Sequence, residues 1–262
     1  MQSDSQNMKD PMTDLVTLTF DGRTATLVLN RAEKRNALSL DLLGALDARL
    51  DELAGHDDVN VCVVTGSEPT FCAGMDLRAV LDEPGAPAKL LSAIAEVTLK
   101  LRALSMVTVA RVNGAAIGGG CGLMATCDLA VTHPDAKLGY PEVDLGVCPG
   151  VVAPWMVKLV GAAKARRILL QGGTMSGLRA HELGMVSHCV PREELDECVL
   201  DMTKRLSGAG SKALRATKQL LNSLDGEDIA SLVRMGAEVS TRVIESEEAR
   251  GMLARAIGTK SP

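Results

Sequence analysis

Aromatic residues are almost absent from this sequence, since one Trp, one Tyr and two Phe make up 2% of its 262 residues. Proteins that bind single-stranded nucleic acid stack the bases on aromatic side chains, so this composition argues against that class. The net charge of −5 at pH 7 gives no overall basic field that would attract nucleic acid or a membrane surface. No apolar run reaches the length of a membrane span. We therefore expect neither nucleic acid nor a membrane as a partner, and an anionic ligand would need a local basic patch.

Paired cysteines are also missing. None of the seven cysteines forms a C-x-x-C pair, and the four histidines are scattered without metal-ligand spacing. A zinc site or a disulfide framework is therefore not expected. Residues 1–12 are polar and lack the apolar core of a signal peptide, so they are expected to form a disordered tail. Together these features favour a reducing, cytoplasmic location, without a metal.

The hydrophobic fraction of 46% supports a packed core, and strand-like runs alternate with helical runs through the first half of the chain. This alternation predicts a layered α/β fold with crossover connections. Beyond about residue 150 the runs are mostly helical. We therefore expect a core over residues 13–200 and a C-terminal helical region over 201–262. The strand-like runs lie at 15–20, 24–30, 59–65, 107–112 and 129–132, and helical runs lie at 40–53, 90–104, 120–127, 151–160, 162–170, 176–183, 192–206, 212–224 and 227–257.

A glycine cluster at Gly118, Gly119 and Gly120 separates the strand-like run 107–112 from a helical run. Glycines that open a helix leave backbone N–H groups free to approach a negatively charged oxygen. The earlier segment Phe71–Leu77 repeats this design after another strand-like run. Glu142, behind Pro141, is the nearest acid/base candidate. Two groups of N–H donors and one carboxylate suggest an oxyanion hole with a general base.

Four segments together resemble the enoyl-CoA hydratase/isomerase family, also called the crotonase superfamily. Their order and spacing match the family, and with the helical tail the resemblance covers nearly the whole chain past residue 13. The segments are LNRAEKRNALS (29–39), FCAGMDL (71–77), NGAAIGGGCGLMATCDLAV (113–131) and LGYPEVDLGVCPG (138–150). The fold that the resemblance implies is a spiral of ββα units followed by a helical trimerisation region. It also implies an acyl-CoA thioester as substrate, no cofactor other than the coenzyme A of that substrate, and a homotrimer or a dimer of trimers.

The same resemblance implies roles for individual residues. Ala73 and Gly119 match the two N–H positions of the oxyanion hole, and Glu142 matches the second of two catalytic glutamates. The residues expected to contact the acyl-CoA are Arg35, Ala37, Ala73, Gly74, Met75, Asp76, Leu77 and Gly119. With Arg31 and Lys34, Arg35 also forms a basic loop that suits the phosphates of coenzyme A.

The chain departs from the family pattern at two acidic positions. The first catalytic glutamate would fall at Gly122, and an acidic position of dienoyl-CoA isomerase-like members would fall at Gly150. Asp144 is the other carboxylate close in sequence to Glu142. The resemblance implies an enoyl-CoA hydratase, which adds water syn to a 2-enoyl-CoA. Because the first glutamate is missing, this hydratase would work with a single glutamate. A Δ3-Δ2 enoyl-CoA isomerase is the alternative, because a lone glutamate can also move a proton along the acyl chain.

Two alternatives come from other classes. Gly120-x-Gly122-x-x-Ala125, with Glu142 about twenty residues further on, fits a loose dinucleotide fingerprint, which would make the chain a Rossmann NAD-binding oxidoreductase. Against this, Glu142 follows a proline in a loop, where the fingerprint requires the end of a strand. The second of these alternatives is a non-catalytic crotonase-like subunit of an assembly. The matching residues Ala73, Gly119 and Glu142 argue against it.

Overall fold

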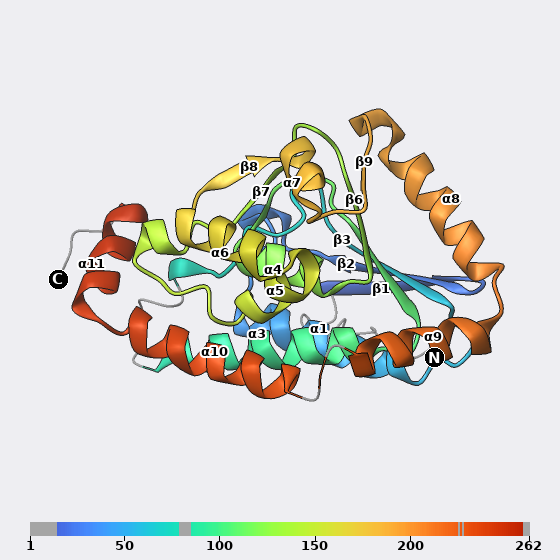
Figure 1. The fold of residues 1–262 in the computed structure, drawn as a ribbon, viewed down its shortest axis with the longest axis horizontal. Helices are drawn as coiled ribbons and strands as arrows, with labels where there is room; N and C mark the ends of the chain where they lie inside the picture. The colour runs from blue at the N-terminus through green and yellow to red at the C-terminus, as the bar shows by residue number, and fades with distance from the viewer. Residues whose placement is uncertain (1–14, 79–84, 225, 227, 259–262) are drawn as a thin grey trace, which may run out of the picture.

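Two β-sheets surrounded by helices make up the computed structural model of the chain (Figure 1), which describes residues 15–78, 85–224, 226 and 228–258. The tail expected at residues 1–12 lies outside the described residues. The strands are β1 (Val16–Asp21), β2 (Thr24–Leu29), β3 (Val61–Gly66), β4 (Val107–Arg111), β5 (Ala116–Ile117), β6 (Leu129–Thr132), β7 (Lys137–Gly139), β8 (Thr174–Ser176) and β9 (His188–Cys189). The α/β class predicted from the alternating pattern is confirmed.

The larger sheet has the strand order β1-β2-β3-β4-β6-β9. Strands β1 and β2 form an antiparallel hairpin, and every later neighbour in this sheet is parallel. Because parallel neighbours need a crossover, the chain leaves the sheet after each of these strands and returns beside it. Strands β2, β3, β4 and β6 are thus added one by one in chain order, which is the progression of a spiral.

Strand β3 lies in the middle of this sheet, and all six of its residues are buried. Successive side chains of a strand point to opposite faces. Cys62 and Val64 accordingly belong to the main core, whereas Val61 and Val63 belong to a smaller cluster that includes Val199 of α8 (Leu195–Ser207). Both faces of the sheet are therefore covered here, as an apolar run without alternation predicts.

The second sheet has three short strands in the order β5-β7-β8. Each contains only two or three residues, so neither an alternating pattern nor a run of apolar residues identifies it in the sequence. This sheet matters for function because β5 ends directly before the glycine cluster and β7 ends shortly before Glu142.

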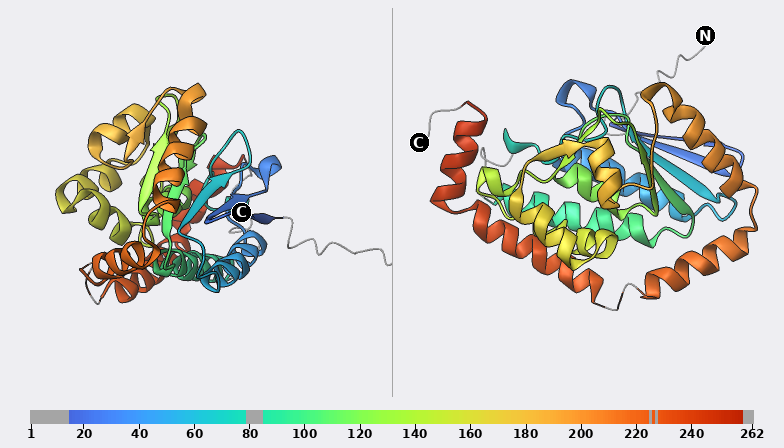
Figure 2. Two further views of the ribbon diagram at one scale, coloured as in Figure 1. Left: turned by 90° about the vertical axis from the view of Figure 1, so that its right-hand side faces the viewer. Right: turned by 45° about the horizontal axis from the view of Figure 1, so that its top comes forward.

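The helices are placed in layers around the sheets. Helix α3 packs against α1 on one side and α10 on the other, and α10 also packs against α5; α10 runs along the length of α3 in Figure 1. Figure 2 shows α8 standing apart from these helices, across the far side of the larger sheet. The remaining bounds are α1 (Leu40–Ala54), α3 (Ala86–Ala103), α4 (Gly119–Thr126), α5 (Ala153–Val160), α6 (Ala162–Gln171), α7 (Gly177–Leu183), α9 (Ser211–Leu224), α10 (Ile229–Ile244) and α11 (Glu247–Ala256), with short 3-10 turns η1 (Ala32–Lys34), η2 (Val143–Leu145) and η3 (Arg192–Glu194).

The C-terminal helical run expected over 227–257 is wrong as a single element, because the structure has two helices there, α10 and α11. The break comes at Ser246, whose hydroxyl accepts a hydrogen bond from the N–H of Ala249 at 3.2 Å. A serine in this position caps a new helix rather than continuing the previous one. The break lets α11 turn across the end of the molecule and contact η2.

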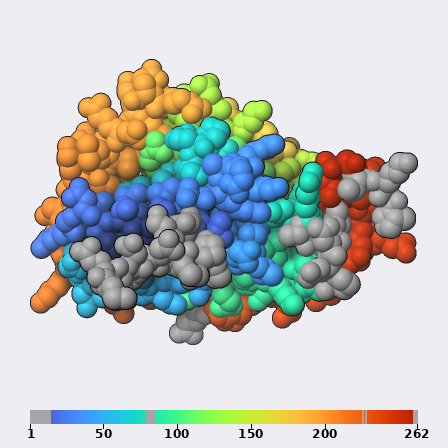
Figure 3. Space-filling view, turned by 180° about the vertical axis from the view of Figure 1, so that it is seen from behind, coloured from blue at the N-terminus to red at the C-terminus, as the bar shows by residue number. Residues whose placement is uncertain are grey.

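The face opposite to that of Figure 1 is shown in Figure 3, with the N-terminal strands at its centre, α8 at one end and α11 at the other. All seven cysteines are free, and Cys148, Cys189 and Cys198 are only partly buried. In the described part of the chain, every helix is too short or too polar to cross a membrane.

Candidate active site

A cleft opens where the two glycine-containing segments meet the loop that carries Glu142. It encloses about 630 Å³ of empty space, including its open mouth. Its lining comes from five parts of the chain, namely residues 73–77, helix α3, residues 117–119, the loop 141–152, and Ser240 of α10. The structure therefore brings together Ala73, Gly119 and Glu142, which the sequence analysis singled out from separate segments. The cleft is mostly apolar, as small-molecule sites usually are.

The segment Phe71–Leu77 is held by backbone pairing on both sides. Ala73 donates its N–H to the carbonyl of Arg35 at 3.0 Å, and Asp76 donates its N–H to the carbonyl of Leu38 at 2.9 Å. The N–H of Gly74 hydrogen-bonds the thiol of Cys72. The N–H of Met75 has no acceptor among the described residues. Met75, unlike Ala73, therefore has a free N–H in the part of this segment that lines the cleft.

The second free donor lies at the start of α4. Gly118 donates its N–H to the carbonyl of Gly139 at 2.8 Å, and Gly119 is the first residue of the helix, where an N–H has no partner within the helix. Glycine is required at Gly74, which has φ +87°, because a Cβ there would lie 2.6 Å from the carbonyl oxygen of Ile117. The same Cβ would lie 3.6 Å from the nitrogen of Gly119, so the two donor segments are in direct contact.

Glu142 is the carboxylate of the cleft. Its Oε2 atom is buried without a hydrogen-bond partner among the described residues, and its Oε1 atom would lie 2.9 Å from a Cβ on Gly118. Burial raises the pKa of Glu142 to about 7, because a charged carboxylate is poorly solvated in an apolar site. A carboxyl group with this pKa can both accept and release a proton near neutral pH.

This burial should make folding stability depend on pH. Folded Glu142 keeps its proton up to about pH 7, whereas the ordinary pKa of a glutamate side chain is 4.5. The contribution of protonated Glu142 to folding stability is complete below the unfolded pKa of 4.5. It is lost as the pH rises through the folded pKa of about 7. Glu142→Gln cannot ionise, so it should be more stable than the wild type at pH 8 by up to about 3 kcal/mol, with the difference vanishing near pH 4. Urea unfolding at both pH values measures this, and a difference independent of pH would contradict it.

Asp144 and Gly150 do not add a second acid to the cleft. Asp144 is exposed and accepts a hydrogen bond from the N–H of Gly173 at 2.7 Å, so its carboxylate is turned to the loop after α6. Gly150 faces α10, where a Cβ would lie 2.2 Å from the carbonyl oxygen of Gly236.

The basic loop Arg31–Arg35 lies beside the first donor segment. Arg31 pairs with Asp76 at 2.8 Å and donates to the carbonyl of Ala37 at 3.1 Å, so its charge is compensated and Asp76 has a structural partner. Lys34 and Arg35 are exposed. The carbonyl of Arg35 is also the acceptor for Ala73, which fixes this loop next to the cleft.

Asn36 is a positioning residue that the sequence analysis did not identify. It is fully buried, and its amide donates to the carbonyls of Ser67 and Thr70 at 2.9 and 2.7 Å, while its Oδ1 accepts the N–H of Arg31 at 2.9 Å. Its φ of 56° lies in the left-handed region, which asparagine tolerates better than most residues. The asparagine after Lys34 and Arg35 was the available signal, because it commonly marks such a turn.

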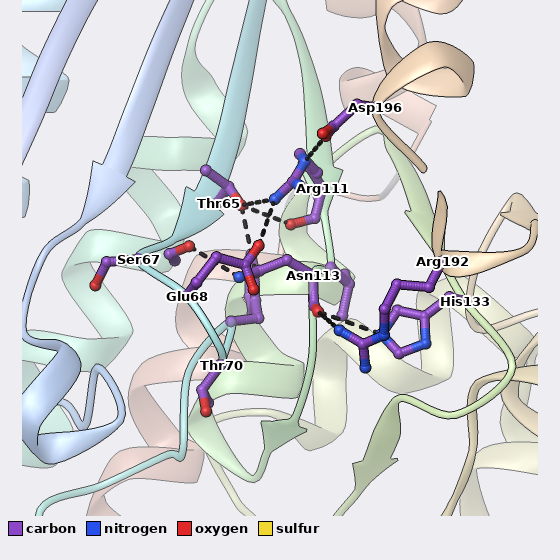
Figure 4. A network of polar contacts seen from close by, with 12 residues as sticks. Thr65, Ser67, Glu68, Thr70, Arg111, Asn113, His133, Arg192 and Asp196 are labelled. Atoms are coloured by element: carbon purple, nitrogen blue, oxygen red, sulfur yellow. Dashed lines mark hydrogen bonds and ion pairs between the residues drawn. The ribbon is translucent and has the colours of Figure 1, made fainter. Parts of the chain in front are cut away.

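A polar network supports the strand ends from which both donor segments depart (Figure 4). The hydroxyl of Thr65 donates to the carbonyl of Arg111 at 2.9 Å, and the amide of Asn113 donates to the carbonyl of Gly66 at 3.0 Å. Arg111 also pairs with Asp196 of α8 at 2.7 Å. None of these residues lines the cleft, so we assign the network to the scaffold.

The family model that matches this chain is described as enoyl-CoA hydratase/isomerase and covers residues 20–255. The chain is 34% identical to the 2,3-dehydroadipyl-CoA hydratase of Escherichia coli K12, over 76% of this chain and 78% of that protein. It is 26% identical to the short-chain-enoyl-CoA hydratase of Clostridium acetobutylicum, over 89% of this chain and 90% of that protein. Among solved structures, an enoyl-CoA hydratase of Mycobacterium smegmatis matches with a TM-score of 0.78 and 29% identity, over 95% of this chain and 98% of that one.

Proposed function

Since the chain belongs to the enoyl-CoA hydratase/isomerase family and has the crotonase fold, we propose that it is an enoyl-CoA hydratase that adds water to a 2-enoyl-CoA thioester. The observation that carries the proposal is the carboxylate of Glu142, whose buried Oε2 atom has no hydrogen-bond partner among the described residues, in an apolar cleft beside two free backbone donors. The same features argue against a non-catalytic subunit. A Rossmann NAD-binding site is not supported either, because Glu142 precedes the turn η2 rather than ending a strand.

The backbone donors would stabilise the charge that forms on the thioester oxygen. Attack at C3 moves an electron pair through C2 onto that oxygen, giving an enolate. We propose that the N–H groups of Met75 and Gly119 bind it, with Met75 in place of Ala73, whose N–H is already donated to Arg35. One preorganised donor of this kind lowers the barrier by about 3 kcal/mol.

Glu142 would carry out both transfers of a single proton. It removes a proton from water as the water oxygen bonds to C3, and it then returns that proton to C2 as the enolate collapses. The net change is the addition of one water across the double bond, and the carboxylate is regenerated. The alternative, isomerisation of a 3-enoyl-CoA, is favoured by the single carboxylate of the cleft, because Glu142 would then move one proton from C2 to C4 without water.

We assign the coenzyme A portion to the side of the cleft that lies next to the basic loop. Lys34 and Arg35 are exposed there, and their charges suit phosphate groups. Ala37, Gly74 and Leu77 complete the proposed contacts with the acyl-CoA. We propose no cofactor and no metal beyond the coenzyme A of the substrate itself, and a cytoplasmic location consistent with the seven free thiols.

A product assay tests the proposed activity. The purified protein is incubated with a panel of 2-enoyl- and 3-enoyl-CoAs, and the products are separated by mass, because hydration adds a water and isomerisation does not. Formation of 3-hydroxyacyl-CoA supports the hydratase, and interconversion of the two enoyl series without added mass supports the isomerase. Titration calorimetry with acetoacetyl-CoA and with NAD is the control that distinguishes an acyl-CoA enzyme from an NAD-binding oxidoreductase. Binding of NAD without binding of the thioester would overturn the proposal.

The pH dependence of catalysis should follow the ionisation of the Glu142 carboxyl group. The carboxylate must be ionised to act as a base, and its pKa is raised to about 7 by burial. We therefore expect kcat/KM to rise about tenfold per pH unit below pH 7 and to level off above it. Steady-state kinetics between pH 5.5 and 8.5 would show this limb. A flat profile over that range would mean that another group accepts the proton.

We further propose that the chain assembles as a homotrimer or a dimer of trimers through its C-terminal helices. Helix α9 is oriented with its polar side inward, since Lys218 is its only buried residue. Three leucines near its C-terminal end face outward, with Leu220, Leu221 and Leu224 exposed by 60, 55 and 72%. A contiguous apolar stripe of this kind is unusual on the surface of a monomer, and a second copy of this chain is the partner we propose.

Light scattering should give a mass about three or six times the 27.5 kDa of one chain. Leu220→Glu combined with Leu224→Glu should lower that mass, because it places charges in the proposed contact. Lys212→Glu, on the exposed start of the same helix, is the matched control and should not change it. A monomeric mass for the wild type at micromolar concentration would overturn the assembly.

A further inference from the structure

Two glycines, Gly118 directly before α4 and Gly122 within it, determine which side chains lie beside the reacting carboxylate. Gly122 donates its N–H to the carbonyl of Gly118 at 2.9 Å, so the two glycines are one helical turn, about 6 Å, apart along the axis. The carboxylate of Glu142 lies over Gly118. The methyl group Cγ1 of Val152 lies over Gly122, where a Cβ would be only 2.5 Å from it. Val152 therefore occupies the position next to Glu142 along this helix.

Val152 is held firmly in that position. Its side chain is 3% exposed, and its carbonyl accepts the N–H of Met156 in the first turn of α5 at 3.0 Å. The preceding loop is fixed to α10, since the hydroxyl of Ser240 accepts the N–H of Gly150 at 3.0 Å and donates to the carbonyl of Cys148 at 2.7 Å. The tight contact between Gly150 and Gly236 leaves no room for the loop to move toward α10.

Few polar side chains line the cleft besides Glu142. Among the described residues they are Cys148 and Ser240. The hydroxyl proton of Ser240 is already donated to Cys148, and burial raises the pKa of the Cys148 thiol, which makes it a poor base near neutral pH. Glu142 is thus left as the single acid/base of the described cleft.

We infer that Val152 is a specificity-determining residue, which excludes any side chain at position 122 and so confines proton transfer to Glu142. The inference rests on the proposed function. With one carboxylate, moving a proton between C2 and C4 needs no other group, whereas water addition needs Glu142 both to hold the water and to protonate C2. By keeping position 122 without a side chain, Val152 lowers the rate of hydration relative to isomerisation in a cleft that still hydrates through Glu142 alone.

The test compares the wild type with Val152→Ala, Gly122→Glu and the double variant. Gly122→Glu alone should fold poorly, because its side chain meets Val152. The double variant should recover the melting temperature and raise the ratio of hydration to isomerisation by at least about tenfold. Its kcat/KM profile should shift to higher pH, because two adjacent carboxylates disfavour ionisation of both. A folded double variant with unchanged product ratio and pH profile would overturn the inference, as would an equal gain in Gly122→Glu alone.

A second cycle covers the case in which the double variant does not fold. Gly122→Ala adds only the Cβ, so it should lower the melting temperature, and Val152→Ala should largely rescue it. Equal losses with and without Val152→Ala would overturn the steric exclusion. If the wild type transforms no enoyl-CoA, the proposed function fails while this cycle still tests the contact. If the wild type is active and the folded double variant keeps its product ratio, only the inference fails.

Discussion

Glu142→Gln should lower kcat by about 10²–10⁴-fold, the range typical for loss of a general acid/base. Glutamine keeps the shape of the side chain but cannot accept a proton from water or return it to C2. The loss should fall on kcat and kcat/KM alike, because it concerns the transition state. Binding of coenzyme A should change little, since the basic loop and both backbone donors remain in place. Stopped-flow kinetics and calorimetry on the same preparation separate the two effects.

The matched control is Asp144→Asn. Asp144 is two residues away but exposed, with its carboxylate bonded to the N–H of Gly173, so this variant should retain activity. Full activity in Glu142→Gln would show that another group performs the chemistry. A large loss in Asp144→Asn with little change in Glu142→Gln would reverse the assignment of the two carboxylates.

Lys218→Met should destabilise the fold by about 3–5 kcal/mol. The ammonium group of Lys218 is buried under α9, where it lies 2.7 Å from Asp128 and donates to the carbonyl of Met106 at 2.8 Å. Asp128 also accepts the N–H of Thr108 at 2.7 Å, so this carboxylate joins three parts of the chain. Removing the lysine leaves the carboxylate poorly compensated in a partly buried site, and the remaining ion pair with Arg102, at 3.2 Å, is longer.

Urea unfolding of Lys218→Met and of Lys212→Met measures this effect. Lys212 lies on the same helix but is exposed, so its replacement should change stability by less than about 0.5 kcal/mol. Combining Lys218→Met with Asp128→Asn should cost less than the sum of the single losses, because both members of the pair are then removed. Equal stability of Lys218→Met and Lys212→Met would show that the buried pair does not stabilise the fold.

The buried position of Lys218 is a feature that the sequence pattern of its helix does not predict. The run 212–224 predicts a helix, and α9 spans Ser211–Leu224. An amphipathic pattern suggests that the apolar side packs inward, yet here Lys218 is buried and Leu224 is exposed. The pattern within the helix does not show which of its two sides packs against the rest of the chain. That is decided by Asp128, a distant residue with which Lys218 forms an ion pair.

The main elements of the first half follow from local signals. The run 40–53 forms α1, which Ser39 caps by accepting the N–H of Leu42, and the run 107–112 forms β4 (Val107–Arg111). These elements form where propensity and periodicity agree over a whole helical turn or strand. The strands β5 and β7 were not predicted, because two or three residues are too few to show a period and are defined by pairing with each other.

By itself the sequence determined the α/β fold class, the glycine segments on either side of the cleft and the carboxylate of Glu142, because each depends on local composition and spacing. Only the tertiary structure decided which N–H of the segment 71–77 is free, because the acceptor for Ala73 is a carbonyl 38 residues earlier, at Arg35. It also decided that Val152 fills the space over Gly122. Both outcomes depend on contacts between segments distant in sequence, and the geometry of such contacts is fixed only when the whole chain packs.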